Sequence, residues 1–212
     1  MISPIFVYGA GGHGKVVADI LISNKEKRFA GFVDDRPQLT GTEVIGYPVL
    51  GNGDWLHRQR TKHPVAVVLG VGNNGNRCRL ARRCAERDIQ ILTAIHRTAA
   101  VASSAALGRG TVVMAAAAIN SEARLGEGVI VNTGAVVEHD VEIGDYAHVS
   151  PNACLGGVAR LGRASHLGLG AMVLPGVSIG PESIIGAGAV VLKDLPGEIV
   201  AVGVPARILR KM

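Results

Sequence analysis

The sequence predicts an α/β N-terminal domain of the Rossmann-like mononucleotide type, followed by a parallel β-helix. A glycine-rich turn between a strand and a helix predicts the first fold, and an aliphatic residue at every sixth position from Ile95 to Val191 predicts the second. The composition agrees, because 48% of the residues are hydrophobic while only 3% are aromatic. The core is therefore expected to consist of Val, Ile, Leu and Ala, and the 29 glycines indicate many tight turns.

A repeat of six residues organises the second half of the chain. Between Ile95 and Val191, 17 aliphatic residues follow one another at this spacing without an exception. Neither a helix nor a simple alternating strand has this period, so each unit is expected to form one short strand and one corner. The aliphatic side chain would point inward. A small residue four positions later is expected where the chain turns the corner, and the frequent glycine after the aliphatic residue would allow unusual backbone angles there.

Three such units would close one triangular coil, and stacked coils about 4.8 Å apart would bury the core. Residues 18 positions apart then lie above one another on the outside. Arg124, Glu142 and Arg160 are expected to form a ladder of alternating charge. A second column is expected to contain Ile130, His148, His166 and Ile184. This column is too apolar for free solvent, which favours a subunit contact or a ligand surface.

The N-terminal part begins with a strand, a glycine turn and a helix. Residues 5–8 form an apolar run, the segment Gly9–Gly14 fits the pattern G-x-G-x-x-G, and the helix would bury Val16, Val17, Ile20 and Leu21. A second strand ends before Asp34, which lies 20 residues after Gly14. In this context glycines let a phosphate approach the backbone at a helix N-terminus, and a carboxylate binds a ribose hydroxyl or a base N–H.

A third strand over residues 65–69 leads into the loop 70–74 and a helix from about Asn76 to Arg87. The whole unit of about 90 residues is the size of one mononucleotide-binding half. A nucleotide diphosphate therefore fits this unit better than NAD does. A tight strand–helix turn without any ligand is the alternative interpretation.

Charge and cysteine content narrow the function classes. The net charge is +5, and the excess lies in residues 1–94, with 13 Lys and Arg against 8 Asp and Glu. An anionic ligand fits this excess better than nucleic acid does, because dense basic runs and aromatic residues are lacking. Three cysteines without metal-ligand spacing suggest a reduced, cytoplasmic protein. No apolar stretch approaches the roughly 20 residues that span a bilayer, so no membrane insertion is expected.

Five motifs, in this order, resemble the bacterial sugar acetyltransferases of the sialic-acid O-acetyltransferase and bacillosamine N-acetyltransferase type. They are YGAGGHG at Tyr8–Gly14, FVDDR at Phe32–Arg36, GVGNN at 70–74 with Arg77, the run Val136–Ala153, and VGVPARIL at Val202–Leu209. This resemblance implies a left-handed β-helix of hexapeptide repeats. It also implies acetyl-CoA as cosubstrate, a nucleotide-linked amino sugar as acceptor, and a homotrimer with active sites between adjacent β-helices. The predicted domains are residues 1–93, 94–196 and a C-terminal tail, 197–212, that packs near the CoA site.

The same resemblance implies roles for individual residues. His139 would be the catalytic histidine, oriented by Asp140. His148 would contact the thioester region of acetyl-CoA, and Asn132 would face His139 of the neighbouring subunit. The CoA groove would be lined by Gly157, Leu169 and Ala187. In the N-terminal domain, the implied phosphate turn is Gly11, Gly12 and His13, the base-recognition segment is Asp34, Asp35 and Arg36, and the wall of the sugar site is Gly72.

The expected chemistry is direct acetyl transfer without a covalent enzyme intermediate. An amine that attacks a thioester must lose a proton, and an imidazole is suited to accept it at neutral pH. Asp140 would hold the useful tautomer of His139 and stabilise its charged form. A backbone N–H such as that of Gly157 would stabilise the developing oxyanion.

Three other functions are compatible with parts of the sequence. A sugar O-acetyltransferase would use the same chemistry on a hydroxyl group. A non-catalytic nucleotide-binding scaffold would bind nucleotide but no acyl-CoA. A zinc lyase would share the β-helix, but it needs three converging histidines, and His139 occupies a different repeat position from His148 and His166. No metal site is therefore expected.

Overall fold

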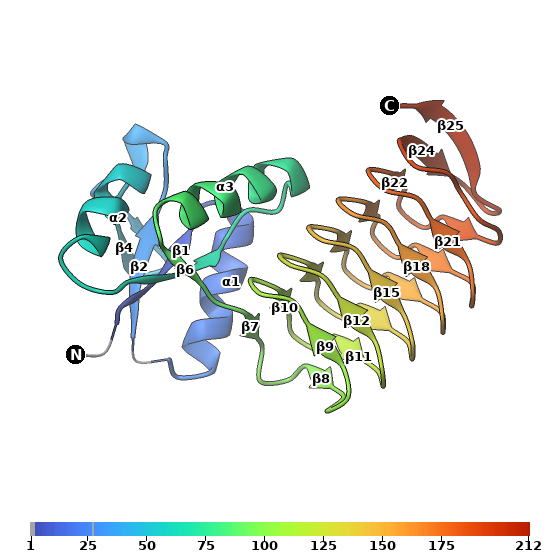
Figure 1. The fold of residues 1–212 in the computed structure, drawn as a ribbon, viewed down its shortest axis with the longest axis horizontal. Helices are drawn as coiled ribbons and strands as arrows, with labels where there is room; N and C mark the ends of the chain where they lie inside the picture. Colours follow the sequence, from blue (N-terminus) through green and yellow to red (C-terminus); the bar gives the residue numbers. More distant parts are fainter. Residues whose placement is uncertain (1–2, 27) are drawn as a thin grey trace. The chain divides into compact units, whose positions relative to one another are not determined.

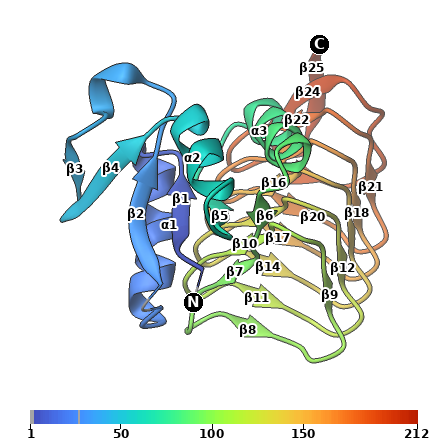
Figure 2. The same ribbon diagram turned by 60° about the vertical axis from the view of Figure 1, so that its left-hand side comes forward.

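The computed structural model describes residues 3–26 and 28–212, and the chain divides into two compact units after Arg97. The first unit holds a mostly parallel sheet with the strand order β3-β4-β2-β1-β5-β6 (Figure 2). Its strands are β1 (Ile5–Tyr8), β2 (Phe29–Val33), β3 (Glu43–Val44), β4 (Tyr47–Gly51), β5 (Ala66–Leu69) and β6 (Gln90–Ile91). Its helices are α1 (Gly12–Ser23), the short 3-10 helix η1 (Pro37–Leu39), α2 (Gly53–Arg60) and α3 (Asn74–Glu86), and the strand β7 (Ala94–Ile95) follows them.

The predicted turn between β1 and α1 is present and very tight. A side chain on Gly14 would place its Cβ only 1.8 Å from the carbonyl oxygen of Gly9, so residue 14 must be glycine. Helix α1 buries Val17, Ile20 and Leu21 as expected. Val16, predicted on the same face, is instead 40% exposed. The buried face of α1 is formed by Gly14, Val17, Ala18, Ile20 and Leu21, and Val16 lies beside it.

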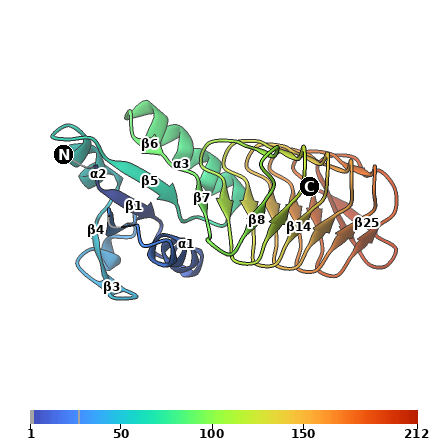
Figure 3. The ribbon, with the colours of Figure 1, turned by 90° about the horizontal axis from the view of Figure 1, so that it is seen from below.

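The second unit is a stack of short coils (Figures 1 and 3). One of its sheets contains β8 (Ala100–Val101), β11 (Ala118–Ile119), β14 (Val136–Val137), β17 (Cys154–Leu155), β20 (Met172–Val173) and β23 (Val190–Val191). A second contains β9 (Ala106–Leu107), β12 (Arg124–Leu125), β15 (Glu142–Ile143), β18 (Arg160–Leu161) and β21 (Ser178–Ile179). The third includes β10 (Val112–Val113), β13 (Ile130–Val131), β16 (His148–Val149), β19 (His166–Leu167), β22 (Ile184–Ile185), β24 (Ile199–Val202) and β25 (Arg207–Lys211).

The pairing register confirms the six-residue repeat and the predicted fold class. Each short strand pairs in parallel with the strand 18 residues later, as Ile143 does with Leu161. The repeated aliphatic residues are buried from Val113 to Val191, so they fill the interior of the coils. Nearly the whole core is therefore made of aliphatic side chains that recur once per side of each coil.

One expectation about the corners is wrong. The small residues four positions after the aliphatic ones, such as Ala123 and Ala135, do lie in the corners, where they are fully buried two residues ahead of the next aliphatic side chain. The left-handed backbone angles lie one residue earlier in the corner, for example at Asp140 with φ of 59°. Glycines after the aliphatic positions serve close packing instead: a Cβ on Gly162 would lie 2.4 Å from the backbone nitrogen of Pro181.

The C-terminal residues continue the coil stack. Strand β24 pairs in parallel with β22, and β25 returns antiparallel to β24. The predicted tail 197–212 therefore extends one sheet of the β-helix, and its place near a CoA site stays a prediction. No helix among the described residues is both long and apolar enough to cross a membrane.

The close approach at Gly162 leads to a testable difference between two kinds of glycine. Gly162→Ala should lower the free energy of unfolding by about 1–3 kcal/mol, because its methyl group overpacks against the next coil. Gly176→Asn should stay within about 1 kcal/mol of wild type, since residue 176 has φ of 74° and open space around it. Thermal unfolding followed by circular dichroism measures both, and equal losses in the two variants would contradict the close-packing role.

Candidate active site

A cavity of about 310 Å³ opens in the first unit at the carboxyl ends of β1 and β2. Open α/β sheets bind ligands at this edge. The cavity is lined by Tyr8, Gly9, Asp34, Asp35, Val71, Asn76, Arg79, Leu80 and Arg83. Two carboxylates and two guanidinium groups therefore surround the space in which the nucleotide is expected.

Asp34, which was expected to bind the ribose or the base of a nucleotide, is hydrogen-bonded to the glycine turn. Its Oδ2 accepts the backbone N–H of Ala10 at 2.8 Å, and the guanidinium of Arg36 binds both of its oxygens, at 2.8 and 2.9 Å. Burial by itself would raise the pKa of Asp34, but the hydrogen bonds from Arg36 and Ala10 hold this pKa below its usual value. In this structure Asp34 and Arg36 thus form an ion pair, and Asp34 also binds the glycine turn.

Asp35 joins three elements of the first unit. Its carboxylate accepts hydrogen bonds from the Tyr8 hydroxyl at 2.9 Å, the Gly53 N–H at 2.9 Å and Arg83 at 2.7 Å. Burial opposes ionisation of Asp35, yet these donors lower its pKa below the usual value. Burial and the neighbouring carboxylate raise the pKa of Tyr8, so the phenol stays protonated and donates. The result is a charged rim fixed beside the cavity.

The other predicted residues of this unit gather around the start of α1. Gly11 is the N-cap, and a side chain on Gly72 would meet the ring of His13 at 3.6 Å. Burial, and then the charge of Arg77, lower the pKa of His13 to about 4, so its ring is neutral at pH 7. Arg77 is fully buried and donates to the carbonyl oxygens of Val71 and Gly72 at 3.2 and 3.0 Å. It thereby holds the loop that was predicted to wall the sugar site.

The outer surfaces of the three β-helix sheets differ in chemistry. We name the apolar face by its outward residues Ala100, Ala118, Val136, Cys154, Met172 and Val190. The charged face carries Arg124, Glu142 and Arg160, and the histidine face carries His148 and His166. The chain passes from the histidine face round the Asn132 corner (132–135) to the apolar face, and then round the His139 corner (138–141) to the charged face.

The His139 corner holds an imidazole–carboxylate pair. Nδ1 of His139 lies 2.9 Å from Oδ2 of Asp140, and both side chains are more than half exposed. An ionised carboxylate can only accept a hydrogen bond, so in the neutral ring Nδ1 carries the proton and Nε2 has the lone pair. Asp140 reaches the ring from a left-handed backbone conformation with φ of 59°. The corner therefore presents a base in a defined tautomer.

Gly157 lies one coil above His139 and leaves room for this base. A Cβ at residue 157 would fall 2.5 Å from Nε2 of His139, so any side chain there would collide with the imidazole. Gly157 is buried, and no acceptor among the described residues takes its backbone N–H. A hydrogen-bond donor thus lies beside the basic nitrogen, which is the arrangement that a developing oxyanion needs.

A second polar cluster lies where the histidine face meets the Asn132 corner. Nδ2 of Asn132 lies 3.0 Å from Nε2 of His148. The rings of His148 and His166 are parallel within 4°, with centroids 4.7 Å apart, which confirms the predicted stack. Ile130 and Ile184 flank these two histidines in the register, as expected.

The predicted CoA residues divide between the two corners. Gly157 belongs to the His139 corner, whereas Leu169 and Ala187 lie above the Asn132 corner, where the N–H of residue 188 donates to the Leu169 carbonyl at 2.8 Å. Leu169 is 58% exposed. Within one chain the whole width of the apolar face separates these two groups. A single subunit therefore does not bring Asn132 and His148 to His139.

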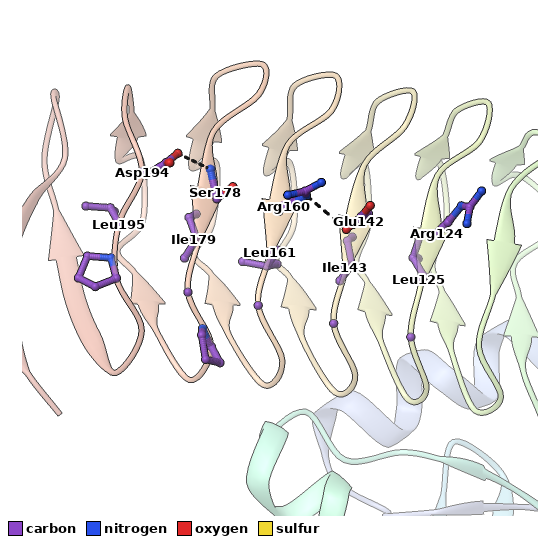
Figure 4. A pocket seen from close by; sticks show the side chains of 16 residues that line it. Arg124, Leu125, Glu142, Ile143, Arg160, Leu161, Ser178, Ile179, Asp194 and Leu195 are labelled. Carbon is purple, nitrogen blue, oxygen red and sulfur yellow. Dashed lines mark hydrogen bonds and ion pairs between the residues drawn. The ribbon is translucent and has the colours of Figure 1, made fainter.

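A groove larger than the first-unit cavity lies elsewhere. It occupies about 1010 Å³ along the charged face, where Arg160 and Glu142 form an ion pair at 3.3 Å and Asp194 accepts the N–H of Ser178 (Figure 4). The predicted ladder is thus present in the register, with Glu142 paired to Arg160, and none of the predicted site residues lines this groove. Size alone does not identify an active site, and no histidine lines this groove, whereas the His139 corner presents an imidazole.

Among the described residues no three His, Cys, Asp or Glu side chains converge on a point that could hold a metal ion. A zinc lyase would need His139 to lie near His148 and His166. Within the chain His139 lies at a corner, whereas His148 and His166 lie on the histidine face.

Sequence reasoning missed Tyr8, Asn76, Arg79 and Arg83 as lining residues of the first-unit cavity. Arg79 and Arg83 were detectable, because their spacing of four residues places both on one face of the predicted helix. Tyr8 appeared only as part of a motif. Its role depends on a contact with Asp35 across neighbouring strands, which the linear sequence does not reveal.

Family models match both units. The PglD N-terminal domain matches residues 4–84, and the bacterial transferase hexapeptide model (six repeats) matches residues 122–157. A UDP-N-acetylbacillosamine N-acetyltransferase from Bacillus subtilis is 38% identical over 113 residues, which cover 52% of this chain. The matched segment spans about half (51%) of that relative's length.

Solved structures match nearly the whole chain. PerB from Caulobacter crescentus, in complex with CoA and GDP-perosamine, is 38% identical with a TM-score of 0.92, covering 99% of both chains. The acetyltransferase domain of PglB from Neisseria gonorrhoeae, in complex with acetyl coenzyme A, is 35% identical with a TM-score of 0.91, covering 99% of this chain and 100% of the other. The resemblance drawn from the sequence motifs is thereby confirmed.

The bonds of Asp34 predict a pH-dependent contribution to the stability of the first unit. Asp34→Asn should lower the free energy of unfolding by about 1–3 kcal/mol at pH 7, through weakened bonds to Arg36 and Ala10. Because the folded state lowers the pKa of Asp34, its stabilisation is complete above the unfolded pKa of about 3.9. It is lost progressively as the pH falls from that value through the lowered folded-state pKa, so the difference between wild type and variant should shrink below about pH 4.

Urea unfolding followed by the fluorescence of Trp55, the only tryptophan, reports on this unit. Asp54→Asn is the matched control, since the Asp54 carboxylate in its ion pair with Arg87 is 65% exposed, and it should cost under about 1 kcal/mol. A loss in Asp34→Asn that stays constant down to pH 3 would contradict the charged role.

Proposed function

The chain belongs to the hexapeptide-repeat sugar acetyltransferases with a PglD-type N-terminal domain, and we propose that it acetylates a nucleotide-linked amino sugar. Acetyl-CoA is the donor in this proposal, and the product is the N-acetylated sugar. The observation that carries the proposal is the His139–Asp140 pair, in which Asp140 contacts Nδ1 and Nε2 lies beside Gly157. The first unit would bind the nucleotide at the cavity next to Tyr8, Asp35 and Arg83.

In the proposed reaction the acceptor amine attacks the thioester carbonyl, and Nε2 of His139 takes the proton that the amine loses. Asp140 stabilises the imidazolium that forms, as it accepts from Nδ1 at 2.9 Å. The N–H of Gly157 stabilises the oxyanion of the tetrahedral intermediate. Collapse of this intermediate breaks the bond to sulfur and releases CoA, whose thiolate recovers the proton.

A homotrimer would complete the site. The apolar face carries only Ala, Val, Cys and Met side chains on its outside, and Met172 is 53% exposed, which favours a subunit contact. If this face lies against a threefold axis, the His139 corner of one subunit comes next to the Asn132 corner of its neighbour. Asn132, His148, Leu169 and Ala187 of the neighbour would then lie opposite His139 and Gly157, with acetyl-CoA between them.

The preferred acceptor in this proposal is a UDP-linked 4-amino-4,6-dideoxy sugar, which is supported by the similarity to a UDP-N-acetylbacillosamine N-acetyltransferase. PerB, which matches along its whole length, is bound to a GDP-linked sugar, so GDP is the strongest competing nucleotide. The cavity offers carboxylate and guanidinium groups to either base. The proposed biological role is in the synthesis of bacterial surface glycans.

The proposed reaction predicts which acceptors release thiol from acetyl-CoA. Nucleotide-linked 4-amino sugars should support turnover, whereas the corresponding 4-hydroxy sugars and free sialic acid should not. His139→Ala should lower kcat by about 10²–10⁴-fold, because the amine then has no base to take its proton. The measurement is the rate of free-thiol formation with UDP-, GDP- and dTDP-sugars.

The matched control is His57→Ala, which removes an exposed histidine of the first unit and should leave turnover unchanged. Full turnover in His139→Ala would contradict its role as the base. Faster acetylation of a hydroxyl acceptor than of any amino sugar would replace the proposal with O-acetylation. Nucleotide binding with no response to acetyl-CoA would favour a scaffold.

A further inference from the structure

The two stacked histidines are held by the same kind of contact, repeated one coil apart. Asn132 lies 3.0 Å from Nε2 of His148, and Oγ of Ser150 lies 2.7 Å from Nε2 of His166. In both pairs the residue at the Asn132 corner precedes its histidine by 16 positions. Because each ring is fixed at the same nitrogen, the two planes stay parallel within 4°.

The contacts of Asn132 determine the tautomer of His148. The backbone N–H of Thr133 donates to Oδ1 of Asn132 at 2.8 Å, which fixes the oxygen side of the amide. The Nδ2 group therefore faces His148 and can only donate. Nε2 of His148 must accept this hydrogen bond, so the neutral ring carries its proton on Nδ1.

Ser150 restricts the His148 ring indirectly, through His166, which stacks on it. Ser150 is only 4% exposed, and its backbone N–H donates to the Leu167 carbonyl at 2.9 Å, so the backbone that carries its hydroxyl is held in place. Its bond to His166 sets the plane of that ring, and the stack at 4.7 Å passes this orientation on to His148. Rotation of the His148 ring would break the stack and the Asn132 bond together.

We propose that Ser150 and His166 are positioning residues, which hold the His148 imidazole in the one orientation toward acetyl-CoA in which Asn132 keeps it Nδ1-protonated. This inference rests on the proposed function, because it takes His148 as a contact of the acetyl thioester. Neither residue touches the reacting atoms. Each acts through His148, whose fixed N–H would orient the donor for attack.

A purely structural role is the main alternative. A β-helix places residues 18 positions apart above one another, as it does for Glu142 and Arg160 on the charged face. Stacking alone would stabilise the coils without regard to the Ser150 hydrogen bond. The two explanations therefore differ in what removal of that hydroxyl does to catalysis.

Steady-state kinetics of Ser150→Ala and His166→Phe distinguish them. The phenyl ring keeps an aromatic stack but loses the bond to Ser150. Both variants should lower kcat/KM for acetyl-CoA by about 10- to 100-fold, because a loosened His148 misplaces the thioester. KM for the nucleotide sugar and the unfolding midpoint should stay near wild type. Ser150→Thr, which keeps a hydroxyl, should restore most of the lost activity.

Arg160→Ala is the matched control, as it breaks a ladder contact on the charged face and should leave the kinetics unchanged. Unaltered kcat/KM for acetyl-CoA in Ser150→Ala would overturn the proposal. So would equal effects on both substrates.

The state of His148 can be tested without activity, which separates this inference from the proposed function. Nuclear magnetic resonance of ¹⁵N-histidine-labelled wild-type protein should give a protonated Nδ1 and an unprotonated Nε2 for His148. In Ser150→Ala the two nitrogen shifts should move toward the average of mixed tautomers. A wild-type ring with its proton on Nε2 would refute the network even if acetyl transfer is found, whereas absence of acetyl transfer would refute the proposed function alone.

Discussion

The backbone ladder between successive coils is the constraint on which the rest of the second unit depends. Each strand donates to the coil that follows, as the Glu142 N–H does to the Ala159 carbonyl at 3.0 Å. These bonds lock residues 18 positions apart into columns, so a side chain's place on the surface is set by its position in the repeat. The aliphatic interior adds the burial that holds the ladder together, since a lone coil could not cover its own core.

The columns give each corner and face its chemistry. One corner stacks Gly157 directly above His139, which frees Nε2 and leaves an N–H donor beside it. The Asn132 corner, where Asn132 contacts His148 of the histidine face, is separated from the His139 corner by the apolar face. The fold thus places these two groups of residues apart on one chain, and in the proposed homotrimer a threefold arrangement about the apolar face would bring them together from neighbouring subunits.

The six-residue period of the sequence predicted the contacts that depend only on the register of the coils. The stack of His148 on His166 and the pairing of Glu142 with Arg160 follow directly from the period. Spacing does not report which backbone atoms approach a residue, so the glycines after the aliphatic positions were assigned to unusual angles when they serve close packing. The contacts of the first unit were harder to predict from the sequence, because the hydrogen bonds of Asp34 to Ala10 and of Asp35 to Tyr8 join segments that are far apart in the chain.

The central claim is that each active site takes His139 from one subunit and His148 from the next. Co-expression of His139→Ala and His148→Ala chains with different tags tests it, because each mixed trimer would contain one site with both histidines intact. Random assembly predicts about a quarter of the wild-type activity, far above either variant alone. Mixed trimers no more active than the two pure variants would contradict a shared site.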